Sequence, residues 1–229
     1  MTTPEQEIEY RQHRFTPPPG STEIFLVRHG ESMPAKASAP FELLDGQADP
    51  DLAPEGREHA ARVARRLAGE RLDALYVTTL RRTVQTAAPL AEKLGLTPAV
   101  EPDLREIYLG DWEKNGLFRK HTTEGHPIVQ RLWTEQRWDV IPGAESDEAF
   151  GCRIRAALTR IAAANPDRRV AVFTHGGVIG EAFAQATRAL DRFAFLGADN
   201  GSVSHLVLHG ENWLVRRFND TAHLAAPLG

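Results

Sequence analysis

The sequence feature that most constrains the fold is an alternation between short apolar runs and longer stretches with helical spacing. Residues 23–27, 74–78 and 170–174 are β-prone and mostly apolar, which is typical of strands buried on both faces of a sheet. Stretches in which apolar residues recur with a helical period lie between these runs. Such alternation favours a largely parallel sheet with helices on both faces. We therefore expect an α/β fold with three α/β/α layers around a mostly parallel central sheet.

Start and stop signals place the helices between the strands. Pro54 and Ser146 are typical of helix N-termini, whereas Gly95 is typical of the residue that follows a helix. The signals predict helices that begin at about residues 54 and 146, and a helix over about residues 81–94. Pro89 predicts a kink or a break inside that helix, because proline lacks a backbone N–H group.

The length of 229 residues fits one large domain with a substantial core. Residues 1–20 are polar and end in three prolines and a glycine, so we expect an N-terminal extension followed by a single domain over residues 21–229. Residues 113–142 break the alternation and predict an irregular insertion over the rim of the functional site, with one helical piece around residues 127–138. Residues 203–209 and 213–218 flank a glycine-containing turn and predict a β-hairpin.

Composition excludes several classes of protein. The formal net charge of −4 argues against a protein whose main role is to coat nucleic acid or an anionic membrane. The chain has no apolar stretch of the roughly 18 residues that a membrane span needs, and it has no secretory signal, so we expect a cytoplasmic protein. Cys152 is the only cysteine, which excludes an internal disulfide and a multi-cysteine metal site. Its flanking residues indicate an inert thiol on the buried side of a helix.

Reactive side chains follow the ends of the predicted strands. Ligands of open α/β sheets bind beyond the carboxyl ends of the strands, so these side chains are expected to meet at one rim. In chain order they are Arg28 and His29, Arg81 and Arg82, Glu106, and His175.

This set of residues suits phosphoryl transfer. Guanidinium groups bind anionic oxygens in pairs, and a helix that begins at Gly176 would direct free N–H groups at the same anion. Nearby arginines would keep a histidine neutral and therefore nucleophilic. A carboxyl group can protonate a leaving alkoxide and then deprotonate water. The pattern predicts transfer through a phosphohistidine, with no metal and no cofactor.

Several motifs resemble, in order, those of the histidine phosphatase superfamily, the phosphoglycerate mutase-like proteins. R-H-G-E-S begins at residue 28, the run T-L-R-R-T-V-Q-T-A at residue 79, L-R-E-I at residue 104, and T-H-G-G-V at residue 174. One short motif is weak evidence, whereas an ordered series over nearly the whole domain is strong evidence.

The resemblance implies a role for six positions. His29 would be the phosphorylated nucleophile and Glu106 the proton donor. Arg82 rather than Arg81 would match the second arginine of the family, because it lies four residues before Thr86. The residues implied to hold the phosphoryl group are Arg28, Arg82, His175 and the Gly176 amide.

The main prediction is a metal-independent phosphomonoesterase of the phosphatase branch that acts on a small phosphorylated substrate. A phosphoglycerate-type mutase is the alternative, and it is disfavoured because the family's usual asparagine after R-H-G-E/Q-S/T has no counterpart in residues 33–48. A catalytically idle member that binds a phosphorylated ligand is a third reading. We expect residues 33–48 and 113–142 to choose the substrate. The family also makes a homodimer one option.

Three aromatic residues near the insertion have plain interpretations. His121 and His126 lack the spacing of zinc ligands, so they are interpreted as surface or substrate-edge residues. Trp112 is interpreted mainly as a core residue.

Overall fold

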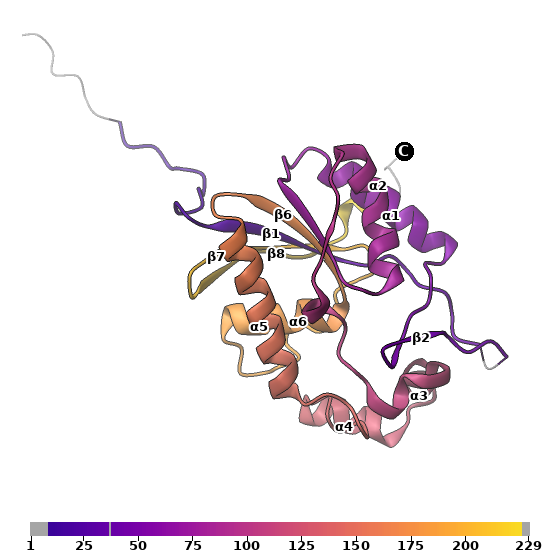
Figure 1. The fold of residues 1–229 in the computed structure, drawn as a ribbon. Coiled ribbons are helices and arrows are strands. Elements are labelled where there is room, and N and C mark those ends of the chain that lie inside the picture. The colour runs from indigo at the N-terminus through magenta and orange to yellow at the C-terminus, as the bar shows by residue number, and fades with distance from the viewer. Residues whose placement is uncertain (1–8, 37, 226–229) are drawn as a thin grey trace, which may run out of the picture.

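The centre of the protein is a mixed six-stranded sheet, seen in a computed structural model that describes residues 9–36 and 38–225 (Figure 1). The strand order is β5-β4-β6-β1-β7-β8. The strands are β1 (Thr22–Arg28), β4 (Ala74–Val77), β5 (Ala99–Val100), β6 (Arg169–Thr174), β7 (Val203–His209) and β8 (Asn212–Asp220).

The four strands from β5 to β1 are parallel, and β7 and β8 add an antiparallel hairpin beside β1. The hairpin turn contains Gly210, whose φ of 55° lies in the left-handed region. β1 and β6 pair in a register that places Arg28 opposite Thr174. Because the strands are parallel, the residues that follow them, His29 and His175, emerge side by side at one edge. The predicted hairpin and mostly parallel sheet are confirmed.

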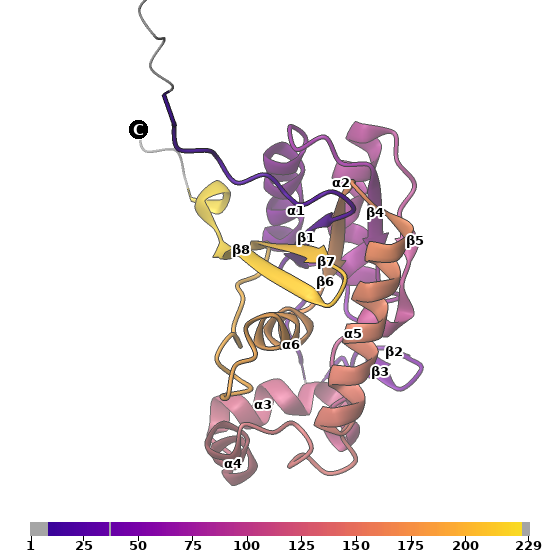
Figure 2. The ribbon, with the colours of Figure 1, turned by 90° about the vertical axis from the view of Figure 1, so that its left-hand side faces the viewer.

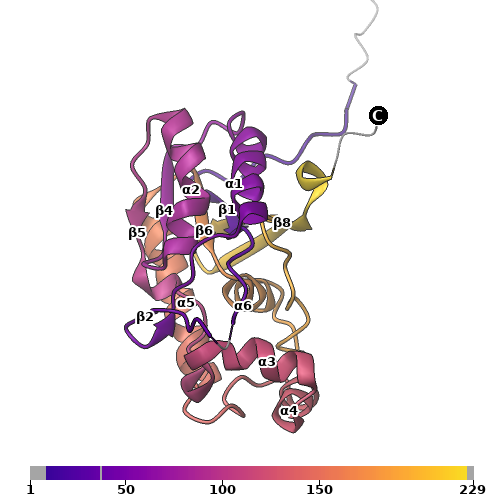
Figure 3. The same ribbon diagram turned by 90° about the vertical axis from the view of Figure 1, so that its right-hand side faces the viewer.

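Helices cover both faces of the sheet, as the views in Figures 1 to 3 show. The helices are α1 (Pro54–Leu67), α2 (Arg81–Leu94), α3 (Leu117–Glu124), α4 (Pro127–Glu135), α5 (Asp147–Ala164) and α6 (Gly176–Thr187). Residues of α1 and α2 pack with Phe25 and Val27 on one face, whereas residues of α5 and α6 pack with Ile24 and Leu26 on the other. Alternate residues of β1 thus contribute to two separate cores, as expected for a strand buried on both faces. The predicted three-layer fold is confirmed.

The predicted helix boundaries agree well with the structure. Pro54 is the first residue of α1, and the Ser146 hydroxyl accepts a hydrogen bond from the Ala149 N–H group at the start of α5. Gly95 ends α2 with a φ of 66°. A break at Pro89 is wrong, because α2 continues through this residue to Leu94, and the alternative of a kink stays a prediction.

The insertion is more regular than predicted. The sequence suggests one helical piece around residues 127–138, whereas the structure has two helices, α3 and α4, and a short 3-10 turn at Lys114–Gly116. In all three views α3 and α4 form a group at the lower end of the molecule, away from most of the sheet. A two-stranded ribbon of β2 (Leu43–Leu44) and β3 (Gln47–Ala48) contributes to the loop over residues 33–48. The sequence does not predict α3, because none of its described side chains is fully buried. Such a helix lacks the continuous apolar stripe that would mark it in the sequence.

The interpretation of Cys152 as a buried thiol is wrong, because this residue is exposed. The apolar face of α5 contains Phe150, Ile154 and Leu158, and a residue two positions after Phe150 points about 200° away from it.

Some predictions on domain organisation are left open by the structure. Residues 9–20 of the predicted extension contain no helix or strand, and residues 1–8 lie outside the described residues. Among residues 9–36 and 38–225, no helix combines the length and apolar character that crossing a bilayer requires.

Candidate active site

His29 lies at the carboxyl end of β1 and is 6% exposed. Its backbone N–H group donates to the Thr174 carbonyl at 3.0 Å, which continues the pairing of β1 with β6 by one residue. The Nδ1 atom lies 2.7 Å from the Gly30 carbonyl oxygen. Since a carbonyl oxygen only accepts hydrogen bonds, Nδ1 carries the proton and Nε2 keeps a free electron pair.

The Nε2 atom of His29 faces Arg82, a residue of the first turn of α2. The Arg82 Nε–H group donates to Nε2 at 3.3 Å, and its NH1 atom donates to the Ala48 carbonyl at 2.9 Å. Arg82 is 8% exposed, and burial lowers its pKa to about 10, against the attraction of Glu106. A positive group therefore lies next to the lone pair of an uncharged histidine.

Arg28 is the last residue of β1, and its side chain lies beside the first residue of α6. A Cβ atom built on Gly176 would lie 3.3 Å from the Arg28 Nε atom, so glycine allows this close approach. The Arg28 NH1 group donates to the Ala198 carbonyl, whereas its buried Nε–H group has no protein partner in the described residues. Burial lowers the pKa of Arg28.

His175 is fully buried and precedes α6 directly. Its ring lies edge-on to that of His29, with centroids 5.2 Å apart, and its Nε2 atom lies 3.2 Å from the Thr78 hydroxyl. Within the described residues its Nδ1 atom has no hydrogen-bond partner.

Both histidines are held in the neutral state. Burial and the charge of Arg82 lower the pKa of His29 and of His175 well below the usual value. Arg28 adds to the effect on each ring.

Glu106 lies in the segment after β5 and lines the same cavity as His29. Its carboxylate accepts hydrogen bonds from the N–H group of Ile107 at 3.0 Å and from that of Gly177 at 3.2 Å. A Cβ atom on Gly177 would lie 2.5 Å from the carboxylate, so a side chain there would displace it. The Glu106 carbonyl accepts from Gln47 and Arg153, and these two residues fix the backbone that carries the carboxylate.

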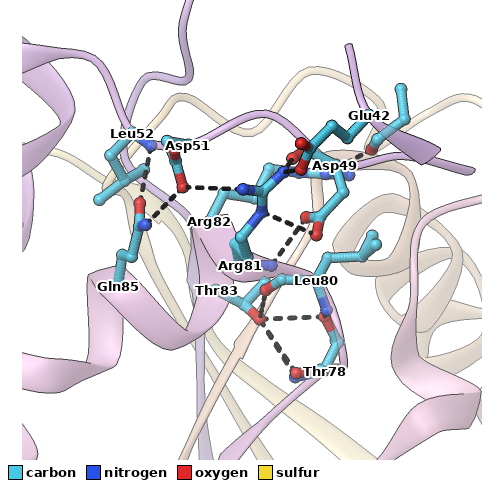
Figure 4. A network of polar contacts seen from close by, with 11 residues as sticks. Glu42, Asp49, Asp51, Leu52, Thr78, Leu80, Arg81, Arg82, Thr83 and Gln85 are labelled. Atoms are coloured by element: carbon cyan, nitrogen blue, oxygen red, sulfur yellow. Dashed lines mark hydrogen bonds and ion pairs between the residues drawn. The ribbon is translucent and has the colours of Figure 1, made fainter. Parts of the chain in front are cut away.

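Neighbouring arginines of α2 have different surroundings (Figure 4). The Arg81 Nε–H group donates to Asp49 at 3.0 Å, and its NH2 group donates to Glu42 at 2.9 Å. Arg82 lines the cavity with His29, whereas Arg81 is absent from its lining. Arg81 thus ties the loop before α1 to the start of α2.

A cavity of about 300 Å³ opens at this rim. Four of the predicted site residues line it, namely Arg28, His29, Arg82 and Glu106. His175 and Gly176 lie behind them, in contact with His29 and Arg28.

Five further polar residues line the cavity, and the family resemblance implies no role for any of them. They are Ser32, Gln47, Glu113, Arg119 and Asn200. The Asn200 side chain donates to the His29 carbonyl at 3.0 Å, and Arg119 on α3 donates to the Ser32 hydroxyl at 2.8 Å. Asn200 lies in a loop far along the chain and carried no sequence signal. Arg119 likewise carried no sequence signal, because it is an exposed residue of a short helix.

The described residues contain no group of three or more His, Cys, Asp or Glu side chains arranged to hold a metal ion. The rings of His121 and His126 pack against Trp112, with centroids 4.7 Å and 5.5 Å from it. Trp112 is 5% exposed, and it belongs to the core while one side lines the cavity.

Together the sheet topology and these contacts define a class of protein, an α/β fold in which histidines and arginines that follow the strands meet at one cavity. A sequence model of the histidine phosphatase superfamily (branch 1) matches residues 24–221. The chain belongs to this superfamily, and the predicted family is confirmed.

Known relatives cover most of the chain. A metal-independent phosphoserine phosphatase of Arabidopsis thaliana is 33% identical over 209 residues, which are 90% of this chain and 84% of that protein. A phosphoglycerate mutase-like protein 4 of the same species is 33% identical over 206 residues, which are 88% of this chain and 86% of that protein. A solved structure of mycobacterial glucosyl-3-phosphoglycerate phosphatase with inorganic phosphate superposes with a TM-score of 0.73 and 27% identity, covering 89% of this chain and 99% of that one. These relatives support the predicted enzyme class, a phosphoric monoester hydrolase of the histidine phosphatase type.

Proposed function

We propose that this protein is a metal-independent phosphomonoesterase that transfers the phosphoryl group of a small phosphorylated substrate to His29. The observation that carries the proposal is the state of this ring. The Nδ1 atom is hydrogen-bonded to the Gly30 carbonyl oxygen. The unprotonated Nε2 atom lies 3.3 Å from the Arg82 Nε atom, in a cavity that Glu106 also lines. A neutral imidazole beside a cation is suited to attack an anionic phosphate, which the cation attracts and orients.

In the first step the Nε2 lone pair attacks phosphorus, and the P–O bond to the alcohol breaks as the P–N bond forms. Glu106 enters this step in its acid form, gives its proton to the leaving oxygen and becomes a carboxylate. Arg28, Arg82, His175 and the Gly176 N–H group stabilise the charge on the transferred phosphoryl group. The Nε atom of Arg28 and the Nδ1 atom of His175 support this role. Both are buried polar atoms, and neither has a hydrogen-bond partner among the described residues.

In the second step the Glu106 carboxylate takes a proton from water, and the resulting hydroxide attacks the phosphohistidine. The P–N bond breaks, its electron pair returns to Nε2, and inorganic phosphate leaves. The two N–H groups on the Glu106 carboxylate hold it in one position for both proton transfers.

The loop after β1 favours hydrolysis over the mutase reaction, because its residues 33–48 contain no asparagine. In this loop the Met33 carbonyl and the Ser32 hydroxyl accept hydrogen bonds from Arg119. An idle binding protein is disfavoured because His29, Glu106 and His175 are all present. The cytoplasmic location, the homodimer, the domain boundaries and the substrate-choosing role of residues 113–142 stay predictions.

The test is detection of the phosphoenzyme. We expect the protein, incubated with 4-nitrophenyl phosphate and excess chelator, to release phosphate and to carry acid-labile, alkali-stable phosphate after rapid quenching. A His29→Ala variant should lose both signals, and a His209→Ala variant, which changes an exposed histidine at the end of β7, should keep them. Hydrolysis without phosphohistidine, or hydrolysis that the chelator abolishes, would contradict the proposal.

A further inference from the structure

The outer side of the cavity is lined by aromatic rings. Four of them face it, and we call them the aromatic wall: Phe41, Trp112, Phe118 and Trp138. Phe41 belongs to the loop over residues 33–48, and Phe118 and Trp138 belong to the insertion. Ile107 and Leu109 extend the same apolar surface.

The aromatic wall is a packed structure. The Trp112 and Phe118 ring centroids are 6.3 Å apart, and those of Phe118 and Trp138 are 6.2 Å apart. Trp112 and Trp138 are 5% and 8% exposed. Such contacts hold the rings in place without a ligand, so a bound group would meet a preformed apolar surface.

The carboxylates that line the cavity already accept hydrogen bonds from backbone N–H groups. Besides Glu106, the only acidic side chain among the described residues that line it is Glu113. Glu113 is 7% exposed, and its two carboxylate oxygens accept hydrogen bonds from the N–H groups of Leu109 and Ala48, each at 2.9 Å. A substrate ammonium group, such as that of phosphoserine, would therefore have to share these carboxylates with backbone N–H groups.

Among the described residues, the one cation on the outer side is Arg119, which also makes hydrogen bonds within the protein. The Arg119 NH1 and NH2 groups donate to the Met33 carbonyl and the Ser32 hydroxyl, at 2.9 Å and 2.8 Å. Its guanidinium lies over the Phe41 ring, 5.4 Å from the centroid. A carboxylate on the substrate would therefore share this guanidinium with Ser32 and Met33, whereas an apolar ring needs no polar partner.

We propose that the alcohol part of the substrate carries an apolar ring that packs against the aromatic wall, rather than the charged groups of an amino acid or a sugar acid. The inference rests on the proposed function, because the wall lines the same cavity as His29 and Glu106. The wall would then provide binding energy for the leaving group, while the arginines of β1 and α2 bind the phosphoryl group.

The test compares primary alkyl phosphates, whose leaving alcohols have similar acidity, so that intrinsic reactivity does not differ. We expect kcat/KM for 2-phenylethyl phosphate to exceed that for ethyl phosphate by about tenfold to a hundredfold, as burial of one ring predicts. Phospho-L-serine should be no better than ethyl phosphate, because its charged groups lose water and meet only side chains that already make hydrogen bonds.

A variant ties this preference to the wall. Phe118→Ala should lower the ratio of the two kcat/KM values severalfold. Trp133→Ala is the matched control, since Trp133 lies on the neighbouring helix α4, is 55% exposed and does not line the cavity, and the ratio should stay as in the wild type. The ratio is independent of the folded fraction, because both substrates are hydrolysed by the same preparation.

Two results would overturn the inference, and they are distinguishable. Hydrolysis of ethyl phosphate with a ratio near one, or a preference for phospho-L-serine, would refute the apolar leaving group and leave the proposed function intact. No phosphohistidine from any of the three esters or from 4-nitrophenyl phosphate would refute both.

Discussion

The two sides of the cavity are built by different means. On the inner side, Arg28, His29 and His175 continue β1 and β6, two central strands in fixed register. On the outer side, the rings of the aromatic wall belong to loops and short helices, and none of them lies on a strand of the central sheet. The inner side is positioned by backbone pairing, whereas the outer side is positioned by side-chain packing.

This contrast is also visible in the glycines. Gly177 lets the Glu106 carboxylate approach the backbone of α6, and Gly176 does the same for Arg28. Gly116, at the start of α3, has a φ of 65° and packs against Ala35 of the facing loop. A change at Gly177 should therefore affect the chemistry, and a change at Gly116 should affect the choice of substrate.

The largest effect is expected on the inner side, from Glu106→Gln. With ethyl phosphate, kcat/KM should fall by about a hundredfold to ten-thousandfold, the usual contribution of a positioned acid. With 4-nitrophenyl phosphate, the first step should be much less impaired, because the leaving phenolate needs no proton. Quenched-flow measurement of phosphohistidine formation with both substrates distinguishes the two cases. Equal losses with both would exclude Glu106 as the proton donor.

Gly177→Ala tests whether the position of that carboxylate matters. The added Cβ would lie 2.5 Å from the Glu106 carboxylate, and a misplacement of about 1 Å can cost about a hundredfold in rate. We expect kcat/KM for ethyl phosphate to fall by roughly tenfold to a hundredfold. The melting temperature should not fall, since alanine is the better helix former.

Gly69→Ala is the control for this change. A Cβ on Gly69 would meet no atom within 4 Å, so activity should stay at the wild-type level. If Gly177→Ala were as active as Gly69→Ala, the close contact with Glu106 would have no catalytic importance.

Much of the inner side was predictable from sequence, and the physical reason is the sheet. An apolar run followed by Arg28 and His29 predicts a strand and its end, and parallel strands bring their ends to one edge. The same reasoning found His175, and the spacing to Thr86 separated Arg82 from Arg81. What sequence could not give was which ring nitrogen of His29 carries the proton, because that depends on the contacts with the Gly30 carbonyl and Arg82 in three dimensions.

Little of the outer side was predictable. Helix α3 has no buried face among its described residues, so no periodic signal marks it. Phe41 and Phe118 meet the cavity because two segments distant in sequence pack together at Gly116 and Ala35. Single aromatic residues in irregular segments carry no local pattern, so their shared surface appears only in the folded protein.

Gly116→Ala should perturb the outer side alone. The added Cβ would overlap Ala35, so α3 and the facing loop should separate. We expect the preference for 2-phenylethyl phosphate over ethyl phosphate to fall severalfold, while the inhibition constant of inorganic phosphate stays unchanged. Gly125→Ala is the matched control, because its φ of 68° imposes a similar strain of roughly 1–2 kcal/mol without a neighbouring atom. Weaker phosphate inhibition in Gly116→Ala alone would show that the two sides are coupled.

The smallest expected effect is a shift in the pH dependence of kcat/KM. It arises because a charge on the outer side lowers the pKa of His29 on the inner side. Arg119 is one of the positive charges that lower the pKa of His29, and its effect is smaller than those of Arg82 and Arg28. His29 must be neutral to attack, so kcat/KM should be lost only as the pH falls through this lowered pKa, well below the usual 6.5. Removing the charge in Arg119→Gln raises the pKa of His29, and the acid limb should move to higher pH by a fraction of a unit.

Arg119→Lys separates charge from contacts in this measurement. Lysine keeps the positive charge but cannot reproduce the paired hydrogen bonds to Ser32 and Met33, so the acid limb should stay near its wild-type position. Arg131→Gln, on the exposed face of α4, should leave the limb unchanged. Raising the salt concentration should reduce the shift in Arg119→Gln, because a partly exposed charge is screened. A limb that moves equally in Arg119→Gln and Arg119→Lys would show that Arg119 affects His29 through loop structure, and the inner side would then depend on the outer side for its geometry.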